Sequence, residues 1–234
     1  MKTLILIAGH MRSGKNTVGD MLSELFKKHD LTVTQDSFAN GVKTGAIEDF
    51  KPLIDFLNDY ADKLKSQIGS LTGFNKNLPE GPFAMIDSML NQIRTKDDNW
   101  YNEKTPITRF LLQIYGTNIM RNRIDIDWWA KQLKERFISS ISDITIVTDV
   151  RFPNEIEIFA NPQDYRVITI RVERNINNNS VMASHESEIA LDNWTSFDYI
   201  IENNSTLDEL KCSVKTVVDD ILNTKESTEY SFKK

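Results

Sequence analysis

The sequence has 234 residues, 40% of them hydrophobic and 26% charged, which excludes a disordered chain and a disulfide scaffold. Asp and Glu outnumber Lys and Arg by 34 to 28, so the formal net charge is −6 and nucleic acid is not an expected partner. No apolar run reaches the roughly 18 residues of a membrane span, and no signal-peptide cleavage site follows the start. With Cys212 as the sole cysteine, these features predict a soluble, cytoplasmic protein without a membrane partner.

The first elements form a strand, a helix and a second strand. Residues 3–8 are a continuous apolar run that ends at Gly9, which is typical of a strand buried on both faces. From Val18 to Lys28, apolar residues recur at helical spacing. Residues 31–34 then predict a second strand.

A long insertion follows the second strand. About a hundred residues separate it from the next strand, more than a simple crossover needs, and we predict a mostly helical region over 40–140. One helix starts at Thr105-Pro106, and Gly116 is expected to bend or end it. Polar residues spaced by four lie along its outer face: Arg109, Gln113, Thr117 and Arg121.

The last third returns to strands alternating with helices. Residues 144–149, 166–172 and 199–201 predict three strands, and Pro153 opens a short helix. Thr206 and Glu209 form a capping box before a last helix, after which the polar tail from Thr224 is expected to fray. The pattern predicts a single α/β domain over 1–234, with a five-stranded, mostly parallel sheet flanked by helices.

The turn after the first strand carries the strongest motif. Gly9, Gly14 and Lys15 fit the phosphate loop G-x-x-x-x-G-K, between a buried strand and an amphipathic helix. Its backbone N–H groups and the helix N-terminus attract phosphate, and Lys15 can reach the β- and γ-phosphates. Asn16 stands where many loops have Ser or Thr, so Thr17 is the hydroxyl residue that can bind a phosphate or a metal ion. This arrangement favours small-molecule kinases over switch GTPases. Without a ligand role, this segment would be a glycine-rich turn with a surface lysine.

Several further segments occur in the order found in one kinase family. They are Phe38-Ala39 with Lys43, Arg109 to Gln113, Tyr115 to Asn118 with Arg121, Trp128-Trp129, Asp149 to Glu155, His185 to Glu188, and Glu202 to Leu207. Together with the loop, this set resembles the phage-type deoxynucleoside monophosphate kinases, a branch of the P-loop kinases. The family often has aspartate where Asn16 and Asn118 stand.

The resemblance implies transfer of the ATP γ-phosphoryl group to a deoxynucleoside monophosphate, with Mg²⁺, in the cytoplasm of a host cell if the origin is a phage. The implied catalytic residues are Lys15, Arg12, Asp149, Arg151 and Arg174. The implied ATP-binding residues are Gly9, Ser13, Gly14, Lys15, Asn16, Thr17 and Arg171. The implied acceptor-binding residues are Lys43, Arg109, Gln113, Thr117, Asn118, Arg121 and Trp128, and the implied metal ligands are Asn16, Thr17 and Asp149.

Other interpretations stay open. Asp149 would otherwise cap a helix, Arg151 would pair with Glu155, and one of the two adjacent tryptophans is expected in the core. The stretch 173–192 is typical of a lid over ATP. The same loop is compatible with a phosphomevalonate kinase, and a third interpretation is a nucleotide switch or ATPase subunit. A homodimer is compatible with each of these interpretations.

Overall fold

The computed structural model describes residues 1–46, 48, 112, 114–160, 162, 164–175 and 189–231. These residues belong to two compact units. The sheet unit comprises Met1–Ala39 and Asp127–Lys234, and the insertion unit comprises Asn40–Ile126. The insertion unit ends at Ile126, and the helix that follows it belongs to the sheet unit.

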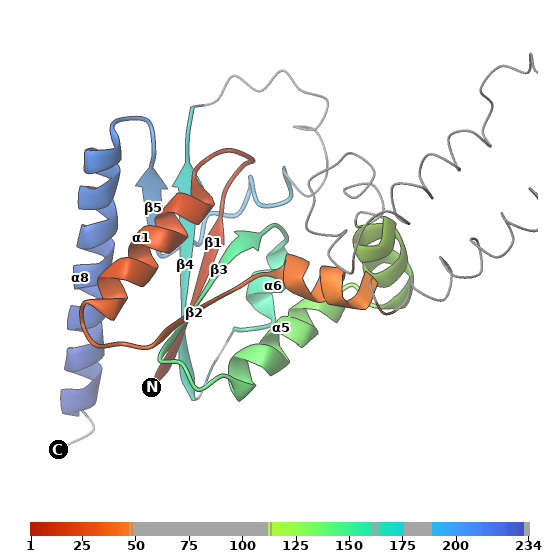
Figure 1. The fold of residues 1–234 in the computed structure, drawn as a ribbon, viewed down its shortest axis with the longest axis horizontal. Coiled ribbons are helices and arrows are strands. Elements are labelled where there is room, and N and C mark those ends of the chain that lie inside the picture. Colours follow the sequence, from red (N-terminus) through yellow and green to blue (C-terminus); the bar gives the residue numbers. More distant parts are fainter. Residues whose placement is uncertain are drawn as a thin grey trace, which may run out of the picture. The chain divides into compact units, whose positions relative to one another are not determined.

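Five parallel strands form the sheet (Figure 1). The strands are β1 (Lys2–Ala8), β2 (Val33–Asp36), β3 (Ile144–Val150), β4 (Tyr165–Glu173) and β5 (Tyr199–Glu202), in the spatial order β2-β3-β1-β4-β5. Every neighbouring pair is parallel. The predicted α/β class and five-stranded sheet are therefore confirmed.

Strand β2 begins two residues later than predicted. Thr32 is held before the strand, because both its backbone N–H and its hydroxyl donate to Asp143 Oδ2, at 2.8 and 2.6 Å. Pairing with β3 starts at Val33, opposite Ile144. A side-chain contact between two loops thus sets where the strand starts.

The strands end together at one edge of the sheet. Ala8, the last residue of β1, lies opposite Val150 of β3 and Arg171 of β4. The last five residues of β1, from Leu4 to Ala8, are at most 1% exposed, and the turn begins at Gly9. In open α/β sheets ligands bind beyond the carboxyl ends of the strands. We therefore expect the ligand-binding site at this edge of the sheet.

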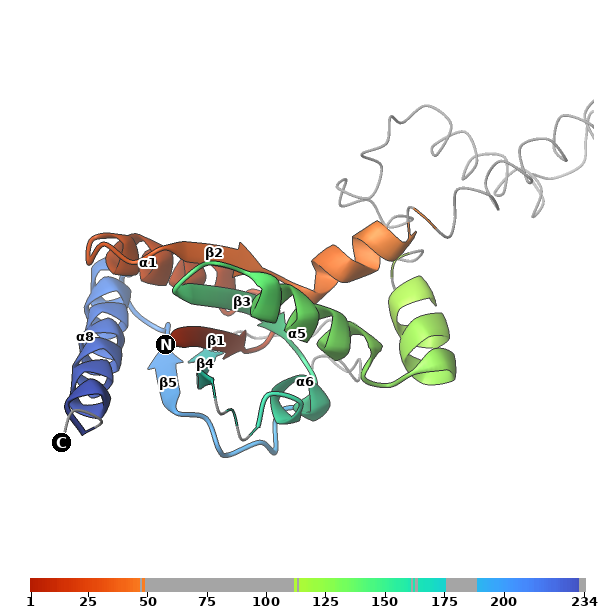
Figure 2. The same cartoon turned by 90° about the horizontal axis from the view of Figure 1, so that it is seen from below.

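Helices cover both faces of the sheet (Figures 1 and 2). On one face lie α1 (Lys15–Lys27) and α8 (Leu207–Ser231), and on the other α5 (Trp128–Ser139) and α6 (Pro153–Glu157). The core between α1, α8 and the sheet includes Val18, Leu22, Phe26, Leu210, Val214, Val218 and Ile221. These apolar residues recur at helical spacing, so the sequence pattern and the buried faces agree.

At the two ends of α8, one detail confirms the prediction and one differs from it. The capping box at Thr206 and Glu209 is present, with reciprocal hydrogen bonds of 3.2 and 3.3 Å. The tail predicted to fray from Thr224 instead continues α8 to Ser231. Since this stretch contains no glycine or proline, nothing in it ends the helix.

In the insertion unit, the described residues include the wide helix η2 (Ile114–Ile124). The N–H of Asp125 donates to the carbonyl of Met120 five residues earlier, at 2.9 Å, which is the π-helical pattern. The sequence predicted that Gly116 bends or ends the helix, but η2 continues through Gly116 to Ile124. Gly116 lies against Val42, and a Cβ there would approach the Val42 side chain to 2.9 Å. A glycine at position 116 therefore allows the helix to pack closely against Val42.

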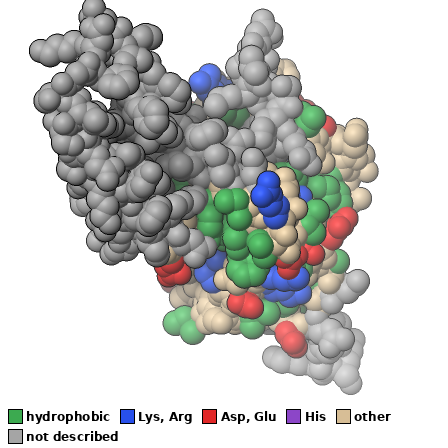
Figure 3. All heavy atoms as spheres, turned by 90° about the vertical axis from the view of Figure 1, so that its right-hand side faces the viewer, with side chains coloured by type: hydrophobic (Ala, Val, Ile, Leu, Met, Phe, Trp, Pro, Cys, Tyr) green, Lys and Arg blue, Asp and Glu red, His purple; other side chains and the backbone are tan. Residues whose placement is uncertain are grey.

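On the face shown in Figure 3, Lys and Arg side chains alternate with acidic and hydrophobic ones. A long polyanion would therefore meet no continuous basic track on the described part of this face. Helices within the described ranges are too short or too polar to cross a membrane.

Candidate active site

The phosphate loop joins β1 to α1. Its first turn is closed by a hydrogen bond of 3.1 Å from the Ser13 N–H to the His10 carbonyl. Three residues have positive φ angles: Gly9 (148°), Arg12 (66°) and Gly14 (99°). A left-handed arginine is uncommon, and such strain of about 1 kcal/mol or more concentrates at functional sites.

Close approach of the backbone explains the glycine at position 9. A Cβ on Gly9 would overlap the carbonyl oxygen of Val172 and lie 2.8 Å from Ser13 Oγ. Any larger residue would push the loop away from the end of β4. Ser13 itself is 1% exposed, and its buried Oγ has no hydrogen-bond partner among the residues that the structure describes. A buried hydroxyl of this kind usually has a partner, so the loop holds a polar atom that a ligand could satisfy.

The start of α1 is suited to an anion. The first intrahelical bond runs from the Val18 N–H to the Gly14 carbonyl at 3.0 Å, and no side chain caps this end in the described part of the chain. The N–H groups of the first turn therefore have no carbonyl of a preceding turn as partner, and the helix dipole adds positive potential. Lys15 lies in the same turn, and its ammonium donates to the carbonyls of Gly9 and His10 at 2.6 and 2.7 Å.

Asp149 lies at the end of β3, beside the loop. Its Oδ1 accepts the Phe38 N–H and its Oδ2 accepts the Ala39 N–H, both at 2.9 Å. Burial of the carboxyl raises its pKa above the ordinary 3.8, although the two N–H donors and Arg151 act in the opposite direction. Asp149 thus caps the helical segment that begins at Phe38, the alternative left open by the sequence. This contact does not exclude a metal-linked role, since each oxygen keeps a further lone pair.

A second carboxylate at this edge is already paired. Asp36 ends β2, and Arg136 from α5 donates to it from Nε at 2.8 Å. Arg136 also donates to the Ser37 carbonyl at 3.1 Å. Sequence analysis missed this pair because its members are a hundred positions apart and neither lies in a local motif.

Glu155 contacts the backbone of Arg151, its predicted partner. The Glu155 carboxylate accepts the backbone N–H groups of Arg151 and Phe152 at 2.7 and 3.1 Å. It therefore fixes the turn between β3 and α6. The Arg151 side chain is exposed at the sheet edge, so its proposed contact with phosphate remains a prediction.

Arg171 and Arg174, predicted side by side, differ in their surroundings. The Arg171 side chain is only 11% exposed and donates to Glu173, the Leu191 carbonyl and Asp192 at 2.8–3.1 Å. Its guanidinium also lies 5.7 Å from the centre of the Phe197 ring. Asp192 additionally pairs with His10 of the loop at 3.1 Å. Arg171 thus organises the wall beside the loop, whereas Arg174 is exposed.

The predicted acceptor residues are described only in part. Lys43, Thr117 and Arg121 are half-buried in the insertion unit, and Trp128 is half-buried at the start of α5. Trp129 is in the core, which confirms that one of the two tryptophans is structural. Arg109, Gln113, the side chain of Asn118, and His185 with Glu188 lie outside the described residues. Most of the predicted lid, residues 176–188, does so too.

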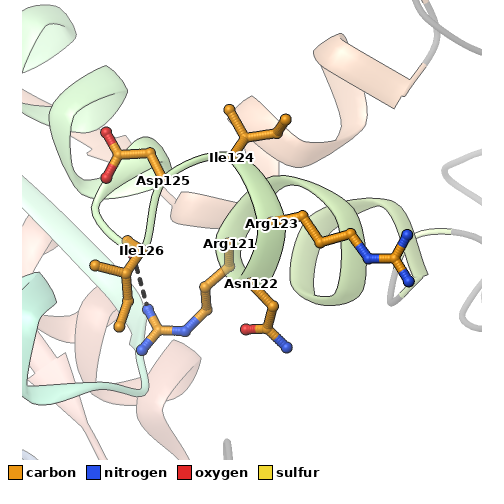
Figure 4. A pocket seen from close by; sticks show the side chains of 6 residues that line it. All are labelled: Arg121, Asn122, Arg123, Ile124, Asp125 and Ile126. Carbon is orange, nitrogen blue, oxygen red and sulfur yellow. Dashed lines mark hydrogen bonds between the residues drawn. The ribbon is translucent and has the colours of Figure 1, made fainter.

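A pocket of about 340 Å³ follows η2 in the insertion unit. It is lined by Arg121, Asn122, Arg123, Ile124, Asp125 and Ile126. Figure 4 shows the guanidinium groups of Arg121 and Arg123 pointing to different sides, and Arg121 donates to the Ile126 carbonyl at 3.1 Å. Since these cations do not converge, the pocket does not by itself form a phosphate site.

No group of three or more His, Cys, Asp or Glu side chains gathers within the described ranges as a metal site. Asn16 and Thr17 are exposed at the start of α1, and Asp149 is the predicted carboxylate ligand. Their side chains carry the oxygen atoms that Mg²⁺ prefers, and Mg²⁺ is commonly held by one or two carboxylates, waters and substrate phosphates.

Comparison with known proteins identifies the family. The family model described as deoxynucleotide monophosphate kinase matches residues 46–214. The chain belongs to this family of kinases. A protein of Acanthamoeba polyphaga mimivirus is 27% identical over 145 residues, which cover 55% of this chain and 68% of that protein. Its name proposes it as a deoxynucleotide monophosphate kinase.

The family match and the loop support the same conclusion from different residues. The matched stretch begins at residue 46, after the phosphate loop, and ends within α8. The loop at residues 9–17 therefore contributes independent support from its own sequence and geometry. The resemblance to deoxynucleoside monophosphate kinases inferred from sequence is confirmed.

Proposed function

We propose that this kinase transfers the γ-phosphoryl group of ATP to a deoxynucleoside 5′-monophosphate and releases the deoxynucleoside diphosphate. The observation that carries the proposal is the loop between β1 and α1: two left-handed glycines, a lysine in the first helical turn, and a buried hydroxyl without a partner. The family match supplies the class of acceptor.

The chemistry requires little more than positioning and charge compensation. The attacking group is a phosphate oxygen that is already ionised at neutral pH, so no general base is needed. Two polyanions must approach each other, and cations that face them lower this repulsion. In the sheet unit, Lys15, Arg12 and Arg174 are the cations proposed for this task, and Arg151 lies at the same edge of the sheet.

The loop fits the triphosphate of ATP. Phosphate oxygens would accept the N–H groups of the first turn of α1 and draw the Lys15 ammonium from the Gly9 and His10 carbonyls, which hold it at 2.6 and 2.7 Å. Ser13 Oγ would gain a partner. Bound Mg²⁺ would neutralise developing charge on the phosphates, and Thr17, Asn16 and Asp149 are the residues proposed to hold it or its waters.

The proposed acceptor side is the insertion. Lys43, Arg109, Gln113, Thr117, Asn118 and Arg121 are proposed to bind the monophosphate and its base, with Trp128 as a stacking surface. An arginine meets a phosphate with paired hydrogen bonds, so these residues suit a small anion. The lid at 173–192 and the cytoplasmic location remain proposals of the same kind.

An assay of ADP formation tests the proposal. We expect turnover with ATP, Mg²⁺ and at least one of the four deoxynucleoside monophosphates, and none with phosphomevalonate. Steady ATP hydrolysis without an acceptor would instead favour an ATPase. Use of phosphomevalonate with no deoxynucleotide turnover would refute the assignment.

Lys15→Ala is the matching loss-of-function variant. Without the ammonium at the phosphates, kcat/KM should fall by at least about a hundredfold. Lys27→Ala is the matched control, since Lys27 is exposed in the last turn of the same helix. Equal activity of the two variants would exclude Lys15 from catalysis.

A further inference from the structure

Strand β5 contributes a side chain to the phosphate loop. Asn203, the residue after β5, donates from Nδ2 to the Ser13 carbonyl at 2.8 Å. The two residues are 190 positions apart in the chain. This hydrogen bond links the edge strand of the sheet to the loop itself, and nothing in the proposed function uses it.

Asn203 is held firmly enough to act on the loop. Its backbone N–H donates to the Glu173 carbonyl at 2.7 Å and so extends the pairing of β5 with β4 by one step. The side chain is half-buried. Gly14 leaves room for it, because a Cβ on Gly14 would overlap the Asn203 amide nitrogen. The glycine and the asparagine therefore fit together as a pair.

The bonded carbonyl belongs to the peptide between Ser13 and Gly14. In a trans peptide the C=O and N–H groups point in opposite directions. A carbonyl anchored on Asn203 therefore keeps the Gly14 N–H turned away from Asn203. Because Gly14 has a φ of 99° and glycine changes conformation at little cost, this peptide would otherwise reorient easily.

We propose that Asn203 is a positioning residue for the donor phosphates: its amide fixes the Ser13–Gly14 peptide so that the Gly14 N–H stays available to a phosphate oxygen. The inference rests on the proposed function, since it assumes that the loop binds ATP. Asn203 acts through the loop and is not itself placed on the substrate.

Two substitutions separate the parts of this role. Asn203→Ala removes the donor, and Asn203→Asp replaces it with a carboxylate that repels the Ser13 carbonyl. Asn204→Asp is the matched control. Asn204 Oδ1 accepts the Asn175 N–H at 2.7 Å, and a carboxylate can still accept that bond while adding the same charge one residue away.

Steady-state kinetics with ATP and a deoxynucleoside monophosphate provide the main test. For Asn203→Ala we expect KM for ATP to rise on the order of tenfold, and for Asn203→Asp more, while KM for the acceptor changes less than about twofold. Asn204→Asp should stay within about threefold of wild type for both substrates. The Gly14 amide resonance should shift on ATP binding in wild type and in Asn204→Asp, and shift less in Asn203→Ala.

The outcomes distinguish the two proposals. If wild-type protein does not bind ATP, the proposed function fails. If wild type binds ATP and Asn203→Ala keeps its KM for ATP, the positioning role is overturned. A lower melting temperature with unchanged KM for ATP in Asn203→Ala would also overturn it, since that is the behaviour of a purely structural contact. If Asn203→Asp does not fold, the uncharged Asn203→Ala variant decides.

Discussion

Asp149 illustrates how one side chain serves both packing and electrostatics. It is the penultimate residue of β3, and its two oxygens accept the first N–H groups of the segment that starts at Phe38. A carboxylate is the only common side chain that accepts two such bonds with two separate oxygens. The same group is desolvated, so the fold keeps a carboxyl with a raised pKa at the edge where phosphate is expected.

The raised pKa of Asp149 predicts the direction of a pH effect. The folded protein holds this proton more tightly than the unfolded chain does. Its stabilising contribution is therefore full below the ordinary pKa of 3.8 and is lost as the pH rises through the raised value. Relative to Asp149→Asn, the wild-type free energy of unfolding should fall over the pH range that starts at the ordinary pKa of 3.8 and extends upward. Urea unfolding of both proteins across this range measures the difference; a rise would mean that the pKa is lowered.

Substitution of Arg171 and of Arg174 by alanine should affect different properties of the protein. Arg171→Ala loses charged hydrogen bonds to Glu173 and Asp192, and we expect destabilisation of about 2 kcal/mol, a fall in melting temperature of roughly 4–8 °C. Arg174 is exposed, so Arg174→Ala should leave the melting temperature unchanged and lower kcat if it contacts phosphate. Thermal unfolding and kinetics of both variants check this. Unchanged kcat in Arg174→Ala would remove it from the catalytic set.

At the scale of elements, α1 lies unusually close to β3. Gly19 faces the strand, and a Cβ there would come within 2.5 Å of Thr148 Cγ2. Thr148 precedes Asp149, so this close contact also sets the distance between the loop helix and the carboxylate. Threonine is stiff at χ1 and gives way poorly.

Gly19→Ala should therefore destabilise the protein, although alanine normally favours a helix. Overpacking costs about 1–3 kcal/mol, against a gain of about 0.5–1 kcal/mol from helix propensity. Thr148→Ser removes the clashing methyl group, so the double variant should recover most of the loss. Chemical denaturation of both single variants and the double variant gives the interaction energy. Additive effects would show that the contact does not determine the spacing.

The elements that the sequence predicted well are those with a local signal. The apolar run of β1, the helical spacing of α1 and the capping box of α8 each depend on neighbouring residues. Two hydrogen bonds depend instead on which distant residues the fold brings together, and no local pattern predicts them. They run from Arg136 to Asp36 and from Asn203 to Ser13. The role of Gly116 was missed for a related reason: its close contact with Val42, more than seventy positions earlier in the chain, accounts for the glycine.

At the scale of the whole molecule, the proposed reaction divides between the two units. The donor loop belongs to the sheet unit, and most of the proposed acceptor residues belong to the insertion. In the proposed reaction, the edge of the sheet binds ATP, and the helical insertion selects the deoxynucleoside monophosphate. Binding of the two substrates should then be separable by mutation.

Ligand-induced stabilisation tests that separation directly. A ligand present at about 100 times its Kd stabilises the folded state by about 2.7 kcal/mol, which corresponds to a rise in melting temperature of roughly 5–10 °C. Wild-type protein should show such a rise with ATP and Mg²⁺, and a rise with the monophosphate as well. Lys15→Ala should lose the response to ATP and keep the response to the monophosphate, whereas Arg109→Ala should show the reverse. Thermal scans of the three proteins with each ligand alone give the four comparisons, and loss of both responses in either variant would contradict separate donor and acceptor sides.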